Sequence, residues 1–375
     1  MIGGGEGAFI GAVHRIAARL DDRYVFLAGA LSATAEKARR SGLALGLDPE
    51  RAYPDFDRMI LGERGRADGI EAVAIVTPNH MHAPAAAACL KAGLHVICDK
   101  PLALNLTEGK RLKKLARGRK LVFAVTYNYT GYPMVRQARA MVAAGALGRL
   151  RVVQVEYPQE WLSEALEKTG QKQAGWRTDP SRSGAGGCIG DIGTHAFNLA
   201  EFVTGLRASE LSADLTTFVK GRRLDDNVQM LLRFEGGARG MLWASQVAPG
   251  HENGLRLRVY GEKGGIEWVQ AEPNHLRWSP FGKPVEIMTR GGAGADPAAT
   301  RVIRIPGGHP EGYLEAFATL YREIADAIQA RGRGHKPDPD VVFPGIDDGV
   351  RGLAFIEAGV RSSARDARWQ RFAAG

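Results

Sequence analysis

The chain has 375 residues, a length that predicts two domains, each large enough to bury its own core. Its net charge is +9, but the densest basic run, residues 110–120, has apolar residues at helical spacing, so we expect a solvated helix face and no nucleic-acid partner. No apolar run is long enough to span a membrane, no signal peptide precedes the first glycines and the three cysteines lack motif spacing, so we expect a cytoplasmic protein with neither disulfides nor a membrane partner.

A glycine-rich run opens the chain and leads into a predicted helix, residues 12–20, then a buried strand, residues 24–31, and a helix from Ala33. Glycine turn, helix and strand in this order indicate a dinucleotide-binding βαβ unit, with a flexible leader as the alternative. The spacing is looser than G-x-G-x-x-G, so Ala8, Phe9 or Gly11 closes the loop. Only Met1 and Ile2 stand where the first strand belongs, so either the true start lies upstream or the domain lacks most of a central strand. The predicted cofactor contacts of this loop are Gly3, Gly5, Ala8, Phe9 and Ile10.

The end of the predicted second strand bears on the choice between NAD and NADP. An NAD-preferring fold usually offers Asp or Glu there for the ribose 2′-hydroxyl. This chain has Ser32 and, further on, Lys37 and Arg39, which suit a 2′-phosphate. We expect Ser32 and Lys37 to contact the cofactor, with a slight preference for NADP over NAD. The alternative is a solvated helix start with surface cations.

Two later strand ends carry polar residues. Residues 72–76 form a β-rich run that ends in Thr77, Pro78 and Asn79 before a helix over residues 83–92. Ligands of parallel sheets bind beyond the carboxyl ends of strands, so we expect these three residues on the nicotinamide side, together with His82 and Asn128. His80 and His82 have no Cys, Asp or Glu at useful spacing, so we expect no metal site.

The next strand, residues 94–98, ends at Asp99, Lys100 and Pro101. Proline stops the strand pairing, which leaves Lys100 at the carboxyl end of the strand. A lysine there can donate to, or polarise, a substrate oxygen. The alternative is a surface lysine before a loop.

Residues 187–195 set Asp191 and His195 four positions apart, ahead of an apolar helical run. If a helix starts here, both side chains lie on one face, with Asp191 in the first turn. A carboxylate beside an imidazole can hold the ring while the ring exchanges a proton with a substrate hydroxyl. The alternative is an ordinary capped helix with a structural histidine.

After a last parallel strand, residues 121–125, the pattern changes, so we expect a dinucleotide-binding domain over residues 1–125 and a second domain over residues 126–375. Strands alternate at period two from Leu150, and glycine turns at residues 235–237 and 261–265 indicate hairpins. We therefore expect an α/β chain whose second, α+β domain holds a large open, mainly antiparallel sheet. A helix over residues 311–330, and a helix plus return strand over residues 347–372, complete the prediction.

The segment over residues 158–187 lacks periodicity and indicates a loop over the site. It carries Trp161, Trp176 and Arg177, whose ring faces and guanidinium suit a sugar, and we expect Tyr129 to reach the same pocket. The alternative is that both tryptophans pack at a domain interface.

The glycine loop, Thr77-Pro78-Asn79, Asp99-Lys100-Pro101 and the motif from Gly190 to His195, in this order, resemble the Gfo/Idh/MocA oxidoreductases over essentially the whole chain. The resemblance implies a Rossmann domain, a homodimer or homotetramer, and a catalytic set of Lys100, Asp191 and His195, which also contact substrate. Asp99 replaces the usual glutamate of that family. The residues 159–161, 176–177 and 225–227 most resemble its levoglucosan dehydrogenase branch, which favours a pyranose or anhydrosugar over a cyclitol.

The implied reaction is the NAD(P)-dependent oxidation of a secondary hydroxyl of a sugar, anhydrosugar, glycoside or cyclitol to a ketone. His195 would be the base, Asp191 its orienting partner, and Lys100 the donor to the oxygen. A redox-neutral oxidoreductive glycosidase would use the same residues, and a cofactor-bound regulatory protein of the same fold is a weaker alternative.

Overall fold

A computed structural model describes residues 1–372 and divides the chain into two compact units. The first unit contains Met1–Thr126 and Phe317–Val350, and the second contains Tyr127–Ala316 and the described residues from Arg351 onward. The return of Phe317–Val350 to the first unit corrects the predicted division at residue 125. The returning segment binds the last strand of the first sheet, where the Val125 N–H donates to the Pro344 carbonyl oxygen at 2.9 Å.

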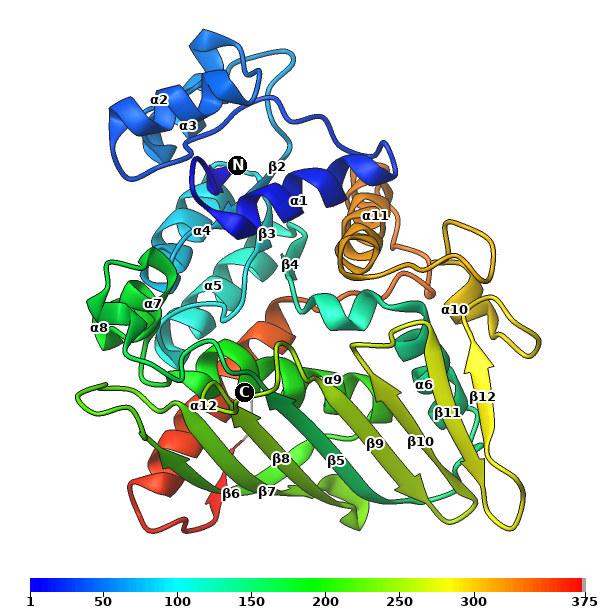
Figure 1. Ribbon diagram of the computed structural model, residues 1–375. Coiled ribbons are helices and arrows are strands. Elements are labelled where there is room, and N and C mark those ends of the chain that lie inside the picture. The colour runs from blue at the N-terminus through cyan, green and yellow to red at the C-terminus, as the bar shows by residue number, and fades with distance from the viewer. Residues whose placement is uncertain (373–375) are drawn as a thin grey trace. The chain divides into compact units, whose positions relative to one another are not determined.

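A four-stranded parallel sheet, in the order β1-β2-β3-β4, is the centre of the first unit (Figure 1). Buried side chains of β2 and β3 form its core, and the polar residues singled out above follow the carboxyl ends of these strands. The elements of this unit are β1 (Ile2–Gly3), α1 (Phe9–Leu20), α2 (Ala35–Ala44), α3 (Phe56–Glu63), β2 (Ala72–Val76), α4 (His82–Lys91), β3 (His95–Cys98), α5 (Leu106–Arg119), β4 (Phe123–Val125) and most of α11 (Tyr313–Gly332).

The predicted strand over residues 24–31 is wrong for most of its length. Only Gly29 and Ala30 form β-bridges, and Val25 is 79% exposed. The Tyr24 ring instead packs edge-on against Tyr321 of α11, a contact with a distant helix that sequence periodicity alone does not reveal. The short first strand is real: β1 pairs with Ile75 and Val76, and the Met1 nitrogen donates to the Ala28 carbonyl oxygen at 2.8 Å.

The second unit is built on a nine-stranded sheet in the order β12-β11-β10-β9-β5-β8-β7-β6-β13. Only β5 and β8 pair in parallel and all other neighbours are antiparallel, as expected for a mainly antiparallel sheet. Its strands are β5 (Leu150–Pro158), β6 (Ala208–Thr216), β7 (Asn227–Phe234), β8 (Arg239–Ser245), β9 (Arg256–Gly261), β10 (Gly264–Val269), β11 (His275–Pro280), β12 (Glu286–Thr289) and β13 (Gln370–Arg371).

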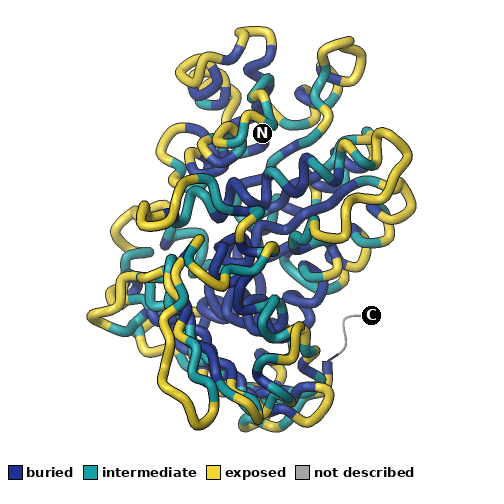
Figure 2. The backbone as a smooth tube through the Cα atoms, turned by 90° about the vertical axis from the view of Figure 1, so that its right-hand side faces the viewer, coloured by how far each residue is buried: buried dark blue, intermediate teal, exposed yellow. Residues whose placement is uncertain are grey.

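Helices cover one face of this sheet and leave the other open (Figure 1). Along β7 the buried Val228, Met230 and Leu232 alternate with outward residues such as Leu231, which is 50% exposed. Figure 2 shows burial along the described residues, with exposed residues at the turns and buried residues within each unit. The helices are α6 (Pro133–Ala143), α7 (Lys172–Arg177), α8 (Pro180–Ser183), α9 (Thr194–Thr204), α10 (Pro297–Thr300) and α12 (Ile346–Ser363), which begins in the first unit. Within the described residues 1–372, no helix is long and apolar enough to cross a bilayer.

Candidate active site

The glycine loop and α1 pack backbone against backbone. Gly3, Gly4 and Gly7 have φ angles of +78°, +75° and +75°, the left-handed region that favours glycine. A Cβ on Gly4 would lie 2.8 Å from the Gly11 Cα, and a Cβ on Gly11 would lie 2.2 Å from the Gly4 carbonyl oxygen. Gly4 and Gly11 are therefore the glycines that let the loop approach the helix; Gly11 was one of the three predicted candidates, whereas Gly4 was not singled out.

The same loop presents an open helix start. Within residues 1–372, α1 has no side-chain cap at its N-terminus, so its first N–H groups stay available to an anion. The Gly5 N–H donates to the Leu31 carbonyl oxygen at 3.0 Å, which fixes the loop at this residue. Phe9 is 67% exposed, whereas Ala8 and Ile10 are partly buried.

Beyond Leu31 come the residues predicted for the ribose, followed by an arginine that is paired with carboxylates. Ser32 and Lys37 are half-buried. Arg40 of α2 donates to the Glu6 carboxylate at 2.9 Å and lies 3.8 Å from the Glu36 carboxylate. The hydrogen bond from Arg40 lowers the pKa of Glu6, so this carboxylate is charged at neutral pH.

The residues after β2 form a polar edge. Asn79 is buried, Pro78 is half-buried, and the buried Thr77 Oγ1 has no hydrogen-bond partner in the part of the chain that the structure describes. An orphaned hydroxyl at the carboxyl end of a parallel strand is suited to a ligand polar group.

His82 supports this edge, and both of its ring nitrogens face main-chain carbonyl oxygens. Its Nδ1 lies 2.8 Å from the Pro101 carbonyl oxygen and its Nε2 lies 2.9 Å from the Thr77 carbonyl oxygen. Burial lowers the pKa of His82. We therefore revise its expected role from a cofactor contact to a link between the loops that follow β2 and β3.

Lys100 stands one residue beyond Asp99 at the end of β3 and is half-buried. The Asp99 N–H donates to the Ile75 carbonyl oxygen at 3.0 Å, which continues the ladder up to the residue before the lysine. Lys100 therefore leaves the sheet at the same edge as Thr77 and Asn79.

In the second unit, Asp191 lies in a π-helical turn, Ile189–Gly193, that runs directly into α9. The sequence predicted an ordinary helix start, and the structure corrects this. The cause is the buried Asp225 carboxylate, which accepts the N–H groups of Gly187 at 2.6 Å and Ile189 at 2.8 Å and so fixes the entry to the turn. Single π-turns frequently occur at functional sites.

Two side chains orient the Asp191 carboxylate. Its Oδ2 accepts hydrogen bonds from Arg177 Nε at 3.2 Å and from Gln246 Nε2 at 2.9 Å. Arg177 was predicted for the substrate and Gln246 was not singled out, because nothing in its local sequence marks the end of β8 as part of the site.

Three tyrosine rings surround His195, which is 8% exposed. The ring centroids of Tyr127, Tyr129 and Tyr157 lie 5.7, 5.0 and 6.4 Å from the imidazole centroid, all edge-on. Tyr129 shares a hydrogen bond with the Tyr157 hydroxyl, and burial raises the pKa of Tyr129, which keeps its hydroxyl neutral. Tyr129, expected at the substrate, is thus also a wall of the histidine site, and Tyr157 was missed although it continues the buried alternation of β5.

The two predicted tryptophans and Arg177 do come together. The Arg177 guanidinium lies 4.3 Å from the Trp176 ring centroid and 5.9 Å from that of Trp161. One face of Trp176 is therefore covered by a cation.

Asn128 is buried, and its Nδ2 has no hydrogen-bond partner among residues 1–372.

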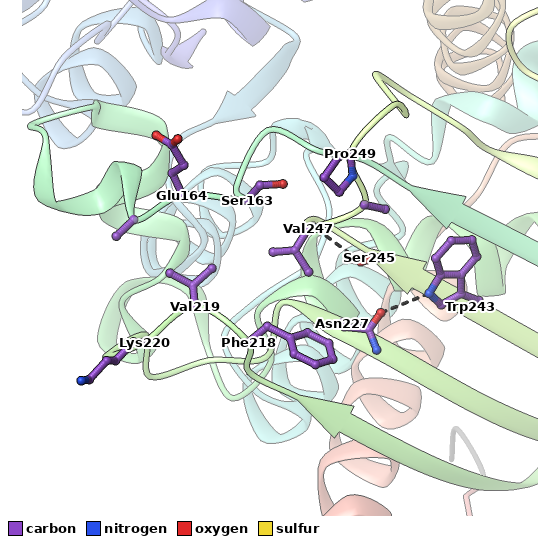
Figure 3. Close-up of a pocket in the computed structure, with 12 residues that line it drawn as sticks. Ser163, Glu164, Phe218, Val219, Lys220, Asn227, Trp243, Ser245, Val247 and Pro249 are labelled. Atoms are coloured by element: carbon purple, nitrogen blue, oxygen red, sulfur yellow. Dashed lines mark hydrogen bonds between the residues drawn. The ribbon is translucent and has the colours of Figure 1, made fainter.

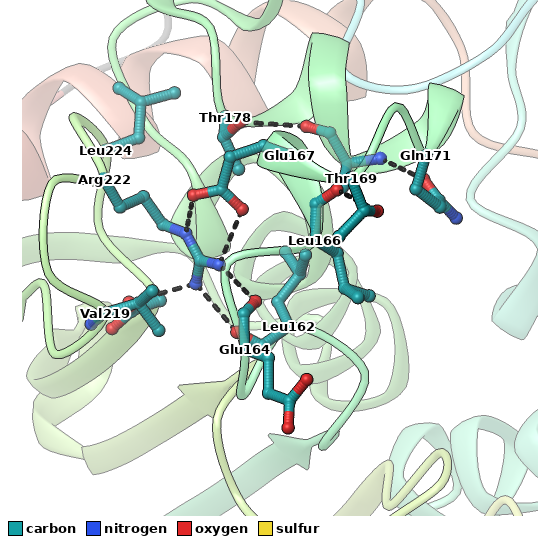
Figure 4. Close-up of polar contacts among 12 residues, drawn as sticks. Leu162, Glu164, Leu166, Glu167, Thr169, Gln171, Thr178, Val219, Arg222 and Leu224 are labelled. Atoms are coloured by element: carbon teal, nitrogen blue, oxygen red, sulfur yellow. Dashed lines mark hydrogen bonds and ion pairs between the residues drawn. The ribbon is translucent and has the colours of Figure 1, made fainter.

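The segment that carries these residues is more ordered than the predicted loop, since it contains α7 and α8. Figure 4 shows how the buried Arg222 holds it. The guanidinium pairs with Glu167 at 3.0 Å and Asp226 at 3.1 Å and donates to the Leu162 carbonyl oxygen at 2.9 Å. A buried arginine with this many acceptors fixes the segment without depending on its helices.

A hollow of about 910 Å³ lies elsewhere in the second unit, between the outward face of β7 and β8 and the neighbouring loops (Figure 3). Trp243 Nε1 donates to Asn227 Oδ1 at 3.1 Å on its floor. None of the predicted site residues lines this hollow, so we do not assign the reaction to it.

Comparisons with known proteins agree with this geometry. Residues 1–127 match the oxidoreductase family with an NAD-binding Rossmann fold, and residues 135–267 match the GFO/IDH/MocA C-terminal domain. The chain belongs to the Gfo/Idh/MocA oxidoreductases.

Three relatives indicate the kinds of oxidoreductase that this Gfo/Idh/MocA chain is similar to. An oxidoreductase from Sinorhizobium meliloti is 56% identical, covers 99% of this chain and 98% of its own, and has a TM-score of 0.89. An inositol dehydrogenase homolog from Azotobacter vinelandii, solved with NADH and myo-inositol, is 38% identical over 99% of this chain and 96% of its own, with a TM-score of 0.92. Levoglucosan dehydrogenase from Pseudarthrobacter phenanthrenivorans is 30% identical over 71% of this chain and 72% of its own length.

The protein is therefore an NAD(P)-dependent oxidoreductase of a family whose members act on CH–OH groups. Its residues fit such a dinucleotide: the Gly4–Gly11 contact leaves a Cβ-free approach, α1 presents uncapped N–H groups among the described residues, and Thr77 offers an orphaned hydroxyl.

Proposed function

We propose that the protein is an NAD-dependent dehydrogenase that oxidises a secondary hydroxyl of a ring polyol to a ketone. The observation that carries this is the Asp191 carboxylate, oriented by Arg177 and Gln246 in the turn that leads to His195. A carboxylate fixed by two side chains, four residues before a histidine ring enclosed by tyrosines, is an arrangement suited to proton acceptance.

In the proposed reaction His195 accepts the proton of the substrate hydroxyl, and Asp191 stabilises the imidazolium that forms. Lys100 donates a hydrogen bond to the oxygen as it becomes a carbonyl oxygen. The chemistry that a bound nicotinamide supplies is acceptance of the hydride from the carbinol carbon. The glycine loop, Thr77 and Asn79 would hold that dinucleotide.

We propose NAD as the preferred cofactor, against the slight preference for NADP that the predicted strand end indicated. Arg40 is the cation of α2 that reaches the glycine loop, and Glu6 and Glu36 already pair with it. A 2′-phosphate would have to displace these carboxylates. The Azotobacter vinelandii relative also binds NADH. Titration of the protein with NADH and NADPH by nicotinamide fluorescence tests this choice, and tighter binding of NADPH would refute it.

As substrates we propose inositols first and pyranoses or anhydrosugars second. The inositol dehydrogenase homolog matches nearly the full length, and Arg177 occupies one face of Trp176, which leaves less aromatic surface for a pyranose to stack on. The test is a panel of cyclitols, sugars, anhydrosugars and aryl glycosides with NAD, read by the absorbance of NADH beside product release. Glycoside cleavage without NADH formation would replace the proposal with the redox-neutral glycosidase.

Two substitutions test the roles of the catalytic set. We expect Lys100→Met and His195→Ala each to lower kcat by about 10²- to 10⁴-fold, because each removes a positioned proton donor or acceptor. NADH affinity should stay close to that of the wild type. Full turnover in either variant would remove that residue from the mechanism.

We further propose that the open face of the nine-stranded sheet joins copies of the chain as a homodimer or homotetramer. Leu231 and Met241 lie opposite each other on β7 and β8, and each is 50% exposed. Light scattering after size exclusion should show a smaller assembly for Leu231→Glu. Leu61→Glu is the control, because Leu61 is 68% exposed on α3 of the first unit.

A further inference from the structure

Two fully buried histidines of the first unit bracket Lys100 without touching the chemistry proposed above. His14 comes from α1 and reaches Asp99, the residue before the lysine, with 3.2 Å between Nε2 and Oδ1. His82 comes from α4 and reaches Pro101, the residue after the lysine, with 2.8 Å between Nδ1 and the carbonyl oxygen.

The hydrogen bonds to the Asp99 carboxylate have a definite direction. Asp99 is held ionised: burial raises the pKa of its carboxyl, but His14 and Thr126 lower it further, to about 2. An ionised carboxylate only accepts, so His14 Nε2 carries a proton and Thr126 Oγ1 donates to the same oxygen at 2.5 Å. Burial raises the pKa of Tyr321, which keeps its hydroxyl protonated, and this hydroxyl shares a hydrogen bond with His14 Nδ1 at 2.8 Å.

The ring of His14 has no room to turn away from this arrangement. It packs against Phe317 at 5.0 Å and Tyr321 at 5.7 Å between ring centroids, both on α11. His14 is 0% exposed and Tyr321 is 3% exposed, so water does not replace the lost contacts if one of them is removed. Asp99 is thus fixed from α1, α11 and the end of β4 together.

His82 fixes the other side of the lysine. Its second ring nitrogen lies 2.9 Å from the carbonyl oxygen of Thr77, so the ring is packed between the loop after β2 and the loop after β3. The main chain at Lys100 therefore has a buried anchor on each side, and both anchors are imidazoles supplied by helices that follow the strands.

We propose that His14 and His82 are positioning residues for Lys100, with Tyr321 fixing the His14 ring. The proposal rests on the proposed function, in which Lys100 donates to the substrate oxygen. A donor displaced by a fraction of its hydrogen-bond length loses most of its effect on the transition state while cofactor and substrate still bind.

The kinetic test is a series of variants assayed with NAD and the substrate that the panel identifies. His14→Ala and His82→Ala should each lower kcat by about 10- to 100-fold, with KM and NADH affinity nearly unchanged. Tyr321→Phe removes one hydroxyl and keeps the ring, so kcat should fall by about 2- to 12-fold, the effect of one hydrogen bond.

Conservative variants separate positioning from general support of the fold. Glutamine places its amide nitrogen about where Nε2 of histidine lies, so His14→Gln should keep the bond to Asp99 and recover most of kcat. Asparagine places its amide near Nδ1 and should recover little. Equal activities of the two variants would contradict the proposal.

The chain offers two matched controls. Tyr24→Phe removes a hydroxyl that donates to the Tyr321 carbonyl oxygen at 3.1 Å, in the same aromatic cluster but not in the bonds to His14. His95→Ala removes an imidazole that accepts the Val122 N–H at 2.9 Å at the opposite end of β3. Both variants should have a lower melting temperature and the same kcat as the wild type.

A substrate-free measurement keeps this inference separable from the proposed function. Trace acetylation with acetic anhydride, read by mass spectrometry at Lys100, reports how the lysine is held. The labelling rate should change several-fold in His14→Ala and His82→Ala and stay constant in Tyr24→Phe and His95→Ala. An unchanged rate in the first pair overturns the positioning role. Changed labelling together with no activity on any polyol would instead sink the proposed function alone.

Discussion

Asp225→Asn is the substitution whose effect follows most directly from the structure. The Asp225 side chain is buried and bonds the N–H groups of Gly187 and Ile189, which begin the turn that carries Asp191. Burial raises the pKa of Asp225 from 3.8 to about 6, and its two backbone hydrogen bonds only partly offset that rise. The folded protein therefore binds this proton more tightly than the unfolded chain does.

The magnitude comes from that difference in pKa. A rise of about 2 units corresponds to about 3 kcal/mol of proton-linked stability. Because the folded pKa is the higher one, this contribution is fully present below pH 3.8 and is lost as the pH rises through about 6. Asparagine does not titrate, so the unfolding free energy of the wild type minus that of Asp225→Asn should fall by about 2 kcal/mol between pH 4 and pH 7.

The assay is urea unfolding of both proteins at a series of pH values, with the two free energies subtracted at each pH. Subtraction removes the many other carboxyl groups that titrate in the same range. Asp179→Asn is the control, because hydrogen bonds from Ser181 lower the pKa of Asp179 and its difference should rise with pH. A wild-type minus Asp225→Asn difference that stays constant from pH 4 to pH 7 would show that burial does not govern this carboxyl and would refute the reasoning.

Three further variants have expected outcomes. Gly11→Ala should lower the melting temperature and weaken NADH binding, because overpacking against Gly4 at about 1–3 kcal/mol exceeds the helix gain, whereas Gly118→Ala, with open space around it, should leave NADH binding unchanged and raise the melting temperature. Arg177→Lys should lower kcat/KM by about 10-fold or more in steady-state assays, since lysine loses the stacking and the directed bond to Asp191. Glu6→Gln should tighten NADPH binding in a fluorescence titration more than NADH binding, and equal changes would contradict the assigned role of Arg40.

The parts of the fold that the sequence predicted are those whose burial is periodic or continuous along one segment. The strand over residues 72–76 and the alternation of β7 are of this kind, and both are confirmed. The strand predicted from Tyr24 is wrong because an apolar run alone does not set strand pairing: Tyr24 packs against Tyr321 of α11, almost 300 positions later in the chain, and Val25 stays exposed. The prediction of an ordinary helix start before α9 was wrong for a similar reason, since Asp225 on another segment accepts the N–H groups at the start of the π-turn.

The candidate site divides in the same way. Thr77, Asn79 and Lys100 were predicted from strand ends, because a parallel sheet gathers the residues that follow its strands at one edge. Gln246 and Tyr157 belong to the second unit's sheet, and their relation to Asp191 and His195 depends on strand order, which no local pattern encodes. His82 was placed on the right segment with the wrong role, because only the structure shows which carbonyl oxygens face its ring.

The chain enters the first unit twice, and this sets the order in which that unit can be completed during synthesis. Residues 1–126 leave the ribosome long before Phe317–Val350, with the whole of Tyr127–Ala316 in between. Until then β4 has no Pro344 to pair with, and His14 has neither Tyr321 nor Phe317 against it. An N-terminal fragment that ends at Thr126 would therefore expose an unpaired strand edge and the apolar surface around His14, both of which favour aggregation over folding. Anyone who transplants the dinucleotide-binding unit into another enzyme must carry both segments across, because a cut at the apparent boundary removes part of its core.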